Sequence, residues 1–156
     1  MDMDMVNVRY MTLNDSVRAG NWMNLKVRKR SGIEAATFPV EILPKTGLSC
    51  FHENRLLAVA FLYLEKSSTV AVCGWIAANP GNTPSESNIA VTELLKAMPE
   101  YARQQGATYL LTTFGNRGIN RIARKMGFLP GEKAENMVMN LFSSLTLVQE
   151  NVHFII

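Results

Sequence analysis

The turn before the central helix is the stretch of this 156-residue chain with the clearest chemical potential. Residues 79–90 read NPGNTPSESNIA and follow a strongly apolar run. Thr83 can cap a helix, Pro84 suits the first helical position, and the Glu86 carboxylate can reach back to the capping amide. The same helix start would also present backbone amides to an anion. The turn is therefore either a helix cap or an anion-binding site.

Candidate groups for proton transfer lie elsewhere in the chain. His52 and Glu53 fall in a predicted hairpin turn, and Glu65 follows a predicted strand. Carboxylates and imidazoles serve as general bases in enzymes, although residues at turns and strand ends are more often solvated than catalytic. No carboxylate lies within residues 70–78. These three residues are therefore the candidate bases, and the sequence does not choose among them.

Other kinds of site have no matching pattern. The two histidines, His52 and His153, are far apart, and no Cys, His and Asp spacing typical of zinc occurs, so no metal site is expected. Nucleophile elbows, Walker loops and dinucleotide glycine patterns are absent, which argues against hydrolase, NTPase and Rossmann functions.

Composition favours a single domain over residues 1–156 that stays in the cytoplasm. The chain is 47% hydrophobic, which is sufficient for one core. Its longest apolar run, Leu56–Leu64, is too short to cross a bilayer, and the amino terminus lacks the pattern of a secretion signal. Cys50 and Cys73 lie in apolar segments, where buried free thiols are common. A net charge of +3 permits acidic ligands but does not indicate nucleic-acid binding.

Hydrophobic periodicity predicts the elements of the first half. Residues 6–11 alternate as a strand does, and Thr12–Asp15 resembles a capping box that starts a helix running to about Arg28. Residues 31–47 are irregular, with a short strand expected at Val40–Leu43. Three antiparallel strands are then predicted, over Leu48–Phe51, Arg55–Leu64 and Val70–Ala78.

The second half changes to a helical period. An apolar stripe predicts a helix from Thr83 or Asn88 to Gln105, with a kink at Pro99. Residues 108–113 read as a buried strand, which should run parallel to Val70–Ala78 because a helix connects the two. A second amphipathic helix is predicted at Asn116–Met126, ended by Gly127. The last expected strand is Met137–Leu141.

This order of elements, together with two sequence segments, resembles the GNAT superfamily of N-acetyltransferases. VRYMTLND at residues 8–15 looks like the family's opening strand and helix entry, and NRGINRIARKMGF at 116–128 is similar to its asparagine-to-phenylalanine segment. The resemblance covers roughly residues 6–141, nearly the whole chain. It implies an α/β fold of the α+β type: a mostly antiparallel mixed sheet with one parallel, splayed strand pair and helices on both faces.

The resemblance also implies a function. Members transfer an acetyl group from acetyl-CoA to an amine, here on a small molecule or a protein, and hold the cofactor at the helix start that follows the strand corresponding to Val70–Ala78. The implied cofactor-binding residues are Ile76, Ala77, Ser85, Ser87, Asn88, Ile89, Ala90 and Asn116.

The chain departs from the family pattern at two places. Ser85 occupies the family's basic position, and Glu86, Asn88 and Ala90 occupy its glycine positions, so no positive charge remains in the turn. Glu86 would also repel a diphosphate. The family's tyrosine, a common general acid, is replaced by Ala123.

Two functions therefore stay open. The first is a divergent acetyl-CoA-dependent N-acyltransferase. The alternative is a catalytically inactive GNAT-like interaction or assembly module, similar to proteins encoded by bacteriophages. In such a module the apolar extension at 142–156, with Leu145–Ile156 at its end, would contact another subunit or a homo-oligomer partner. The basic residues of 26–30 and of the Asn116 helix have two interpretations. They either form solvated surfaces or attract a negatively charged group, which would be an acidic partner or the adenosine phosphates of the cofactor.

Overall fold

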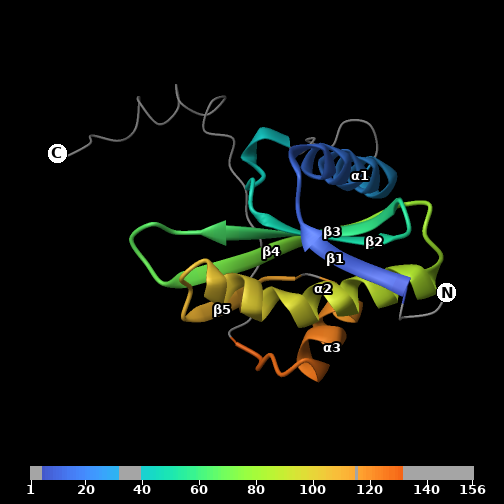
Figure 1. Ribbon diagram of the computed structural model, residues 1–156. Coiled ribbons are helices and arrows are strands. Elements are labelled where there is room, and N and C mark those ends of the chain that lie inside the picture. Colours follow the sequence, from blue (N-terminus) through green and yellow to red (C-terminus); the bar gives the residue numbers. More distant parts are fainter. Residues whose placement is uncertain (1–4, 32–39, 115, 132–156) are drawn as a thin grey trace.

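The computed structural model describes residues 5–31, 40–114 and 116–131 and shows a five-stranded sheet between helices (Figure 1). The strand order β1-β2-β3-β4-β5 follows the sequence, and only the last pair is parallel. The strands are β1 (Val6–Tyr10), β2 (Gly47–His52), β3 (Arg55–Leu64), β4 (Val70–Ala78) and β5 (Tyr109–Thr112). The helices are α1 (Leu13–Ser31), the 3₁₀ helix η2 (Val40–Ile42), α2 (Pro84–Gln104) and α3 (Arg117–Lys125). The predicted mixed sheet is confirmed.

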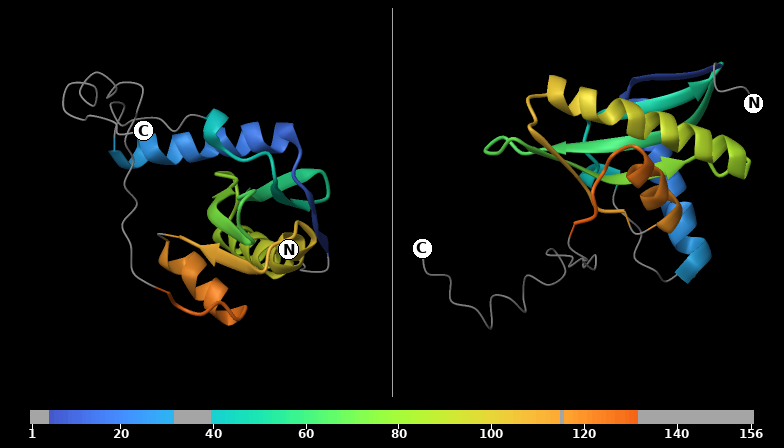
Figure 2. Two further views of the ribbon diagram at one scale, coloured as in Figure 1. Left: turned by 90° about the vertical axis from the view of Figure 1, so that its left-hand side faces the viewer. Right: turned by 90° about the horizontal axis from the view of Figure 1, so that it is seen from below.

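The helices cover both faces of the sheet, as Figure 2 shows most clearly. On one face, Ala19 and Trp22 of α1 pack against Val59 and Phe61 of β3. On the other face, residues of α2, including Leu94 and Met98, pack against Leu57, Leu62 and their neighbours. Because both faces are covered, every side chain from Leu56 to Leu62 of β3 is buried, which explains the continuous apolar sequence there.

The start of α1 is a reciprocal cap of the predicted kind. The Thr12 amide donates to Asp15 Oδ2 at 3.0 Å, and the Asp15 amide donates to Thr12 Oγ1 at 3.2 Å. The Ser49 hydroxyl also donates to Asp15 Oδ2, at 2.9 Å. Asp15 is almost fully buried, so its carboxylate joins helix α1 to the sheet and is not available to a ligand.

The parallel pair β4 and β5 is joined only over its first part. Their pairing runs from Val70 opposite Tyr109 to Cys73 opposite Thr112, where β5 ends, while β4 continues to Ala78. The register of β4 against β3 changes by one residue in the same place, since Phe61 faces Trp75 but Tyr63 faces Val72. This bulge bends β4 as it leaves β5. The ladder between β4 and β5 therefore ends five residues before β4 does.

One prediction about local structure is wrong, and two others concern residues that the structure does not describe. The strand predicted at Val40–Leu43 is wrong, because Val40–Ile42 forms a 3₁₀ turn and Leu43 is buried under α1. Prolines at positions 39 and 44 bracket the segment and cannot donate to a ladder, which favours a single turn. Helix α2 continues through Pro99 to Gln104. The strand predicted at Met137–Leu141 and the extension at 142–156 lie outside the described residues.

Candidate active site

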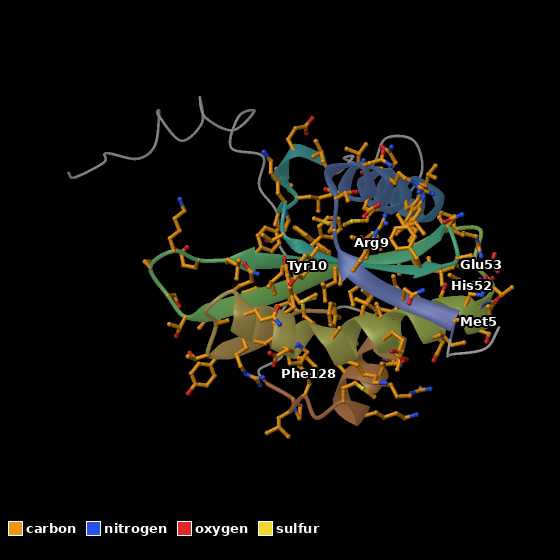
Figure 3. The ribbon with its side chains drawn as sticks, viewed as in Figure 1. Met5, Arg9, Tyr10, His52, Glu53 and Phe128 are labelled. Carbon is orange, nitrogen blue, oxygen red and sulfur yellow. The ribbon has the colours of Figure 1, made fainter. Side chains whose placement is uncertain are left out.

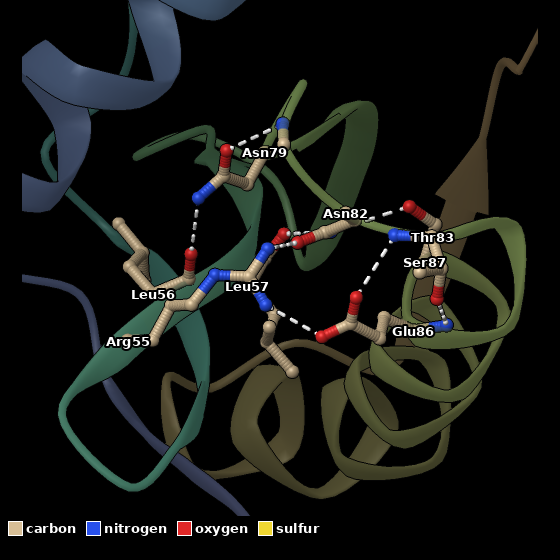
Figure 4. Close-up of polar contacts among 9 residues, drawn as sticks. Arg55, Leu56, Leu57, Asn79, Asn82, Thr83, Glu86 and Ser87 are labelled. Carbon is tan, nitrogen blue, oxygen red and sulfur yellow. Dashed lines mark hydrogen bonds and ion pairs between the residues drawn. The ribbon is translucent and has the colours of Figure 1, made fainter. Parts of the chain in front are cut away.

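The turn that follows β4 ends in a complete capping box (Figure 4). The Glu86 amide donates to Thr83 Oγ1 at 3.2 Å, and the Thr83 amide donates to Glu86 Oε1 at 2.9 Å. The Ser87 amide donates to the Thr83 carbonyl, and Pro84 has no N–H. Of the amides from Thr83 to Ser87, only that of Ser85 has no partner among the described residues. The predicted helix cap is confirmed, and it uses amides that an anion would need.

Arg55, a residue that the sequence analysis did not single out, holds this turn from β3. Its Nη1 lies 2.5 Å from Glu86 Oε2, and its Nη2 donates to Asn82 Oδ1 at 2.9 Å. Asn82 in turn donates to the Leu57 carbonyl at 2.8 Å. The antiparallel register could have revealed the contact: Ala58 faces Ala78, and continuing that pairing places Arg55 opposite Gly81. The turn therefore contains a positive charge.

The negative charge of Glu86 is stabilised by hydrogen bonds and balanced by the positive charge of Arg55. The bond from the Thr83 amide, followed by the bond from the Arg55 guanidinium, lowers the pKa of the Glu86 carboxyl below its ordinary value of 4.5. The carboxylate is therefore ionised at neutral pH, but it lies against an equal and opposite charge. Its repulsion of an approaching phosphate is weaker than the sequence alone predicts.

Beyond Cys73, side chains connect β4 to the chain that follows β5. Ile76 of β4 and Phe114, just after β5, each pack against the apolar cluster under α2 and against a second cluster formed by α2 and α3. The second cluster contains Val91 and Leu95 of α2. The β5-side edge of β4 after Cys73 has no strand partner in the described chain, because the ladder with β5 ends there. Extended ligands commonly pair with the backbone at strand edges of this kind.

Helix α3 is fixed by its own sequence signals at both ends. The Asn116 side-chain oxygen accepts hydrogen bonds from the amides of Gly118 at 2.8 Å and Ile119 at 3.1 Å. Gly127 adopts a positive φ of 95°, and the amide of Phe128 donates to the Ala123 carbonyl. The asparagine-to-phenylalanine segment is therefore a helix with both ends capped. Ala123 is buried between α3 and α2, so no hydroxyl occupies that position.

The three candidate bases lie at opposite ends of the sheet. Figure 3 shows His52 and Glu53 together at the end where α2 begins. This is also the end where β4 finishes, since Asn79 hydrogen-bonds Leu57. Two strand spacings, roughly 10 Å, separate them from β4. Glu65 lies in the β3–β4 turn, beside the start of β4, roughly 17 Å along the strand from Ile76. Its pKa is lowered chiefly by the amide of Ser67, which makes it a weaker base.

The other predicted cofactor-binding residues differ in what they expose. The side chains of Ala77 and Ala90 are buried in the core, so only their backbones can reach a ligand. Ser85 and Asn88 are exposed, and Ile89 is half-buried. The Ser87 hydroxyl accepts a bond from Asn82 at 3.2 Å. Ser85, Ser87, Asn88, Ile89 and Ala90 lie at the start of α2, whereas Ile76 and Ala77 lie in β4 and Asn116 caps α3.

The cysteines of the described chain do not form a reactive site. Burial raises the pKa of Cys50 and of Cys73 to about 12, and neither is in a disulfide. The prediction that both are buried free thiols is confirmed. Among residues 5–31, 40–114 and 116–131 there is no group of three or more His, Cys, Asp or Glu side chains that could hold a metal ion. No helix in that part of the chain is long and apolar enough to span a membrane.

The described chain has concave surfaces beside α2 and on α3. The larger, about 490 Å³, lies between the edge strand β1 and the second half of α2, where the Tyr10 ring is 5.5 Å from the ring of Tyr101. It is three strands away from β4. The smaller, about 350 Å³, is lined by Arg117, Asn120, Arg121 and Arg124 on α3.

No protein-family model and no curated protein matches the chain, but solved structures do. An aminoglycoside acetyltransferase from an uncultured soil metagenomic sample, in complex with sisomicin, is 12% identical with a TM-score of 0.59 over 88% of this chain and 97% of that one. The ribosomal-protein-alanine N-acetyltransferase of Brucella melitensis is 13% identical with a TM-score of 0.60, over 86% and 99% of the two chains. AAC(6')-Iy, in complex with the bisubstrate analogue CoA-S-monomethyl-acetylneamine, is 13% identical with a TM-score of 0.57, over 86% and 98%. The chain therefore has the acetyltransferase fold that its resemblance to the GNAT superfamily predicted.

Proposed function

We propose that this chain, which has the GNAT acetyltransferase fold, is an N-acyltransferase that takes an acetyl group from acetyl-CoA and transfers it to an amine. The observation that carries the proposal is the end of the β4–β5 ladder at Cys73 and Thr112, after which the edge of β4 at Ile76 has no strand partner in the described chain and lies beside α2 and α3. Structures of the same fold include one in complex with a CoA-containing bisubstrate analogue. When bound, acetyl-CoA would supply the acetyl group on a thioester.

The residues present fit one part of this cofactor better than the other. The pantetheine arm is polar and extended. It fits the edge of β4 at Ile76, which has no strand partner in the described chain, and the side-chain nitrogen of Asn116, which makes no hydrogen bond to another described residue. The start of α2 fits the diphosphate poorly, because its capping box already uses the amides of Thr83 and Glu86. Any contact there rests on the Ser85 amide, on the exposed side chains of Ser85 and Asn88, and on the charge of Arg55.

The base that would remove the amine proton is proposed to be His52 or Glu53. Both lie at the end of the sheet where β4 finishes, whereas Glu65 lies at the opposite end. Neither His52 nor Glu53 has an acidic or basic partner holding its side chain in the described chain. A protein or small-molecule amine would be the acceptor, in line with the acceptor named for the Brucella enzyme and the sisomicin bound to the soil enzyme.

The proposal is tested by binding and by turnover with the full chain. Calorimetry with acetyl-CoA measures binding, and release of the free CoA thiol measures turnover with sisomicin and with a peptide that begins with alanine. His52→Gln and Glu53→Gln are compared with Glu65→Gln, the matched control at the other end of the sheet. Loss of a general base should lower kcat by about 10² or more with acetyl-CoA affinity unchanged. Undetectable acetyl-CoA binding by the folded wild type would contradict the proposal.

A further inference from the structure

One face of helix α3 carries three arginines around a concave surface. Arg117, Arg121 and Arg124 are spaced by four and three residues, so they lie on the same side of the helix. All three are exposed, and together with Asn120 they line the cavity of about 350 Å³. We call these four residues the arginine pocket.

The arginine pocket has no counter-charge in the described chain. Arg9, Arg55 and Arg103 each lie against a carboxylate, that of Asp15, Glu86 and Glu100 respectively. Arg117, Arg121 and Arg124 make no ion pair and no hydrogen bond to another described residue. Helix α3 itself contains no acidic residue. The pocket therefore combines three free guanidinium groups in one hollow.

Helix stability does not explain this arrangement. Like charges four residues apart destabilise a helix, and a cation in the first turn, where Arg117 lies, opposes the helix dipole. Only Arg124, in the last turn, is placed favourably for the helix. A bound anion would remove the repulsion, and guanidinium groups bind phosphate oxygens through paired, charge-assisted hydrogen bonds.

The arginine pocket is attached to the chain that follows β5 by direct contacts. The Asn120 side-chain nitrogen donates to the Phe114 carbonyl at 2.8 Å, just after β5 ends. Phe114 packs in the same cluster as Ile76 of β4 and Val91 of α2. Figure 2 shows α3 beside α2 on the side of the sheet opposite α1. The pocket is thus next to the region proposed for the pantetheine arm.

We infer that the arginine pocket is a phosphate-binding site that holds the 3′-phosphate of CoA. The inference rests on the proposed function and extends it: the capped start of α2 leaves few amides for the cofactor's phosphates, and α3 supplies cationic groups on the neighbouring element. A phosphate monoester matches the pocket because it carries nearly two negative charges and three acceptor oxygens for the guanidinium donors.

The test compares CoA with dephospho-CoA, which lacks only the 3′-phosphate. Calorimetric titrations use the full chain as wild type, Arg121→Gln and Lys66→Gln. Lys66 is an exposed residue of the β3–β4 turn, so its variant removes one positive charge away from α3. Both exposed substitutions should leave the unfolding midpoint within about 2 °C.

We expect wild type and Lys66→Gln to bind CoA about tenfold more tightly than dephospho-CoA, and Arg121→Gln to lose most of that preference. The preference should also shrink as salt is added. Equal binding of the two molecules by wild type, or an unchanged preference in Arg121→Gln, would overturn this inference and leave the acyltransferase proposal intact. Binding of neither molecule by wild type would overturn the proposed function and the inference together.

Discussion

Arg55 Nη1, at the start of β3, lies 2.5 Å from Glu86 Oε2 in the first turn of α2. The same guanidinium bonds Asn82, so one side chain connects the β2–β3 hairpin end, the turn after β4 and the helix that follows. The contact sets the charge of the candidate active site, because the acidic residue at the family's glycine position is paired with a cation. It also makes the capping box of α2 part of a larger polar network.

Breaking this pair should cost stability in a non-additive way. We expect Arg55→Gln and Glu86→Gln each to lower the unfolding midpoint by about 2 to 4 °C, and the double variant to lose less than the sum, because either change already removes the ion pair. The effect should be small, since Arg55 is 40% exposed, and should decrease in 1 M salt. Arg103→Gln, which removes an exposed pair with Glu100, is the control and should change little. Additive effects would show that the pair has no coupling.

Stability should fall with acid through Glu86. Its pKa is lowered in the folded chain, first by the Thr83 amide and then by Arg55, so the folded state favours the ionised carboxyl. The stabilisation is present above the ordinary pKa of 4.5 and is lost as pH falls below it. The wild-type advantage in unfolding midpoint over Glu86→Gln should therefore be present at pH 7 and shrink between pH 4.5 and 3. A difference that stays constant over that range would contradict this assignment.

Substitutions at Asn116 distinguish a role in capping α3 from a role in binding the cofactor. Asn116→Asp keeps the oxygen that accepts from Gly118 and Ile119, so the free energy of unfolding should stay within about 0.5 kcal/mol, whereas Asn116→Ala should lose about 1 kcal/mol. If the side-chain nitrogen of Asn116 contacts the cofactor, Asn116→Asp should weaken acetyl-CoA binding while leaving stability unchanged. Unchanged acetyl-CoA affinity in the folded aspartate variant would limit Asn116 to capping. Chemical denaturation and calorimetry provide the two measurements.

Both cysteines should be unreactive in the folded chain. Their pKa values are raised to about 12 by burial, with Glu93 adding a smaller effect at Cys50. At pH 8 only about one thiol in ten thousand would be ionised, and neither is accessible. A thiol reagent such as dithionitrobenzoate should therefore label the native protein very slowly and the urea-unfolded protein at once. Rapid labelling of the native protein at pH 8 would show that one of the two sites is open. The same result validates thiol release as the turnover assay.

The amino-acid sequence by itself determined the elements whose signals are local. Thr83, Pro84 and Glu86 are close enough in the chain to specify the start of α2 by themselves, and Asn116 and Gly127 do the same for the two ends of α3. The helical period between two apolar runs predicted the parallel pairing of β4 and β5, because a crossover helix connects them. The burial of Cys50 and Cys73 followed from the apolar residues around them.

Only the tertiary structure decided which charges share the site. Arg55 and Glu86 are 31 residues apart, and they meet because the register of β3 with β4 brings the start of one strand to the end of the other. The same register places His52 and Glu53 at that end of the sheet and Glu65 at the opposite end, a distinction that residue type cannot make. The burial of Leu43 against Ala19 of α1 likewise joins segments that are distant in the sequence. Contacts between distant segments depend on pairing and packing, which hydrophobic periodicity does not specify.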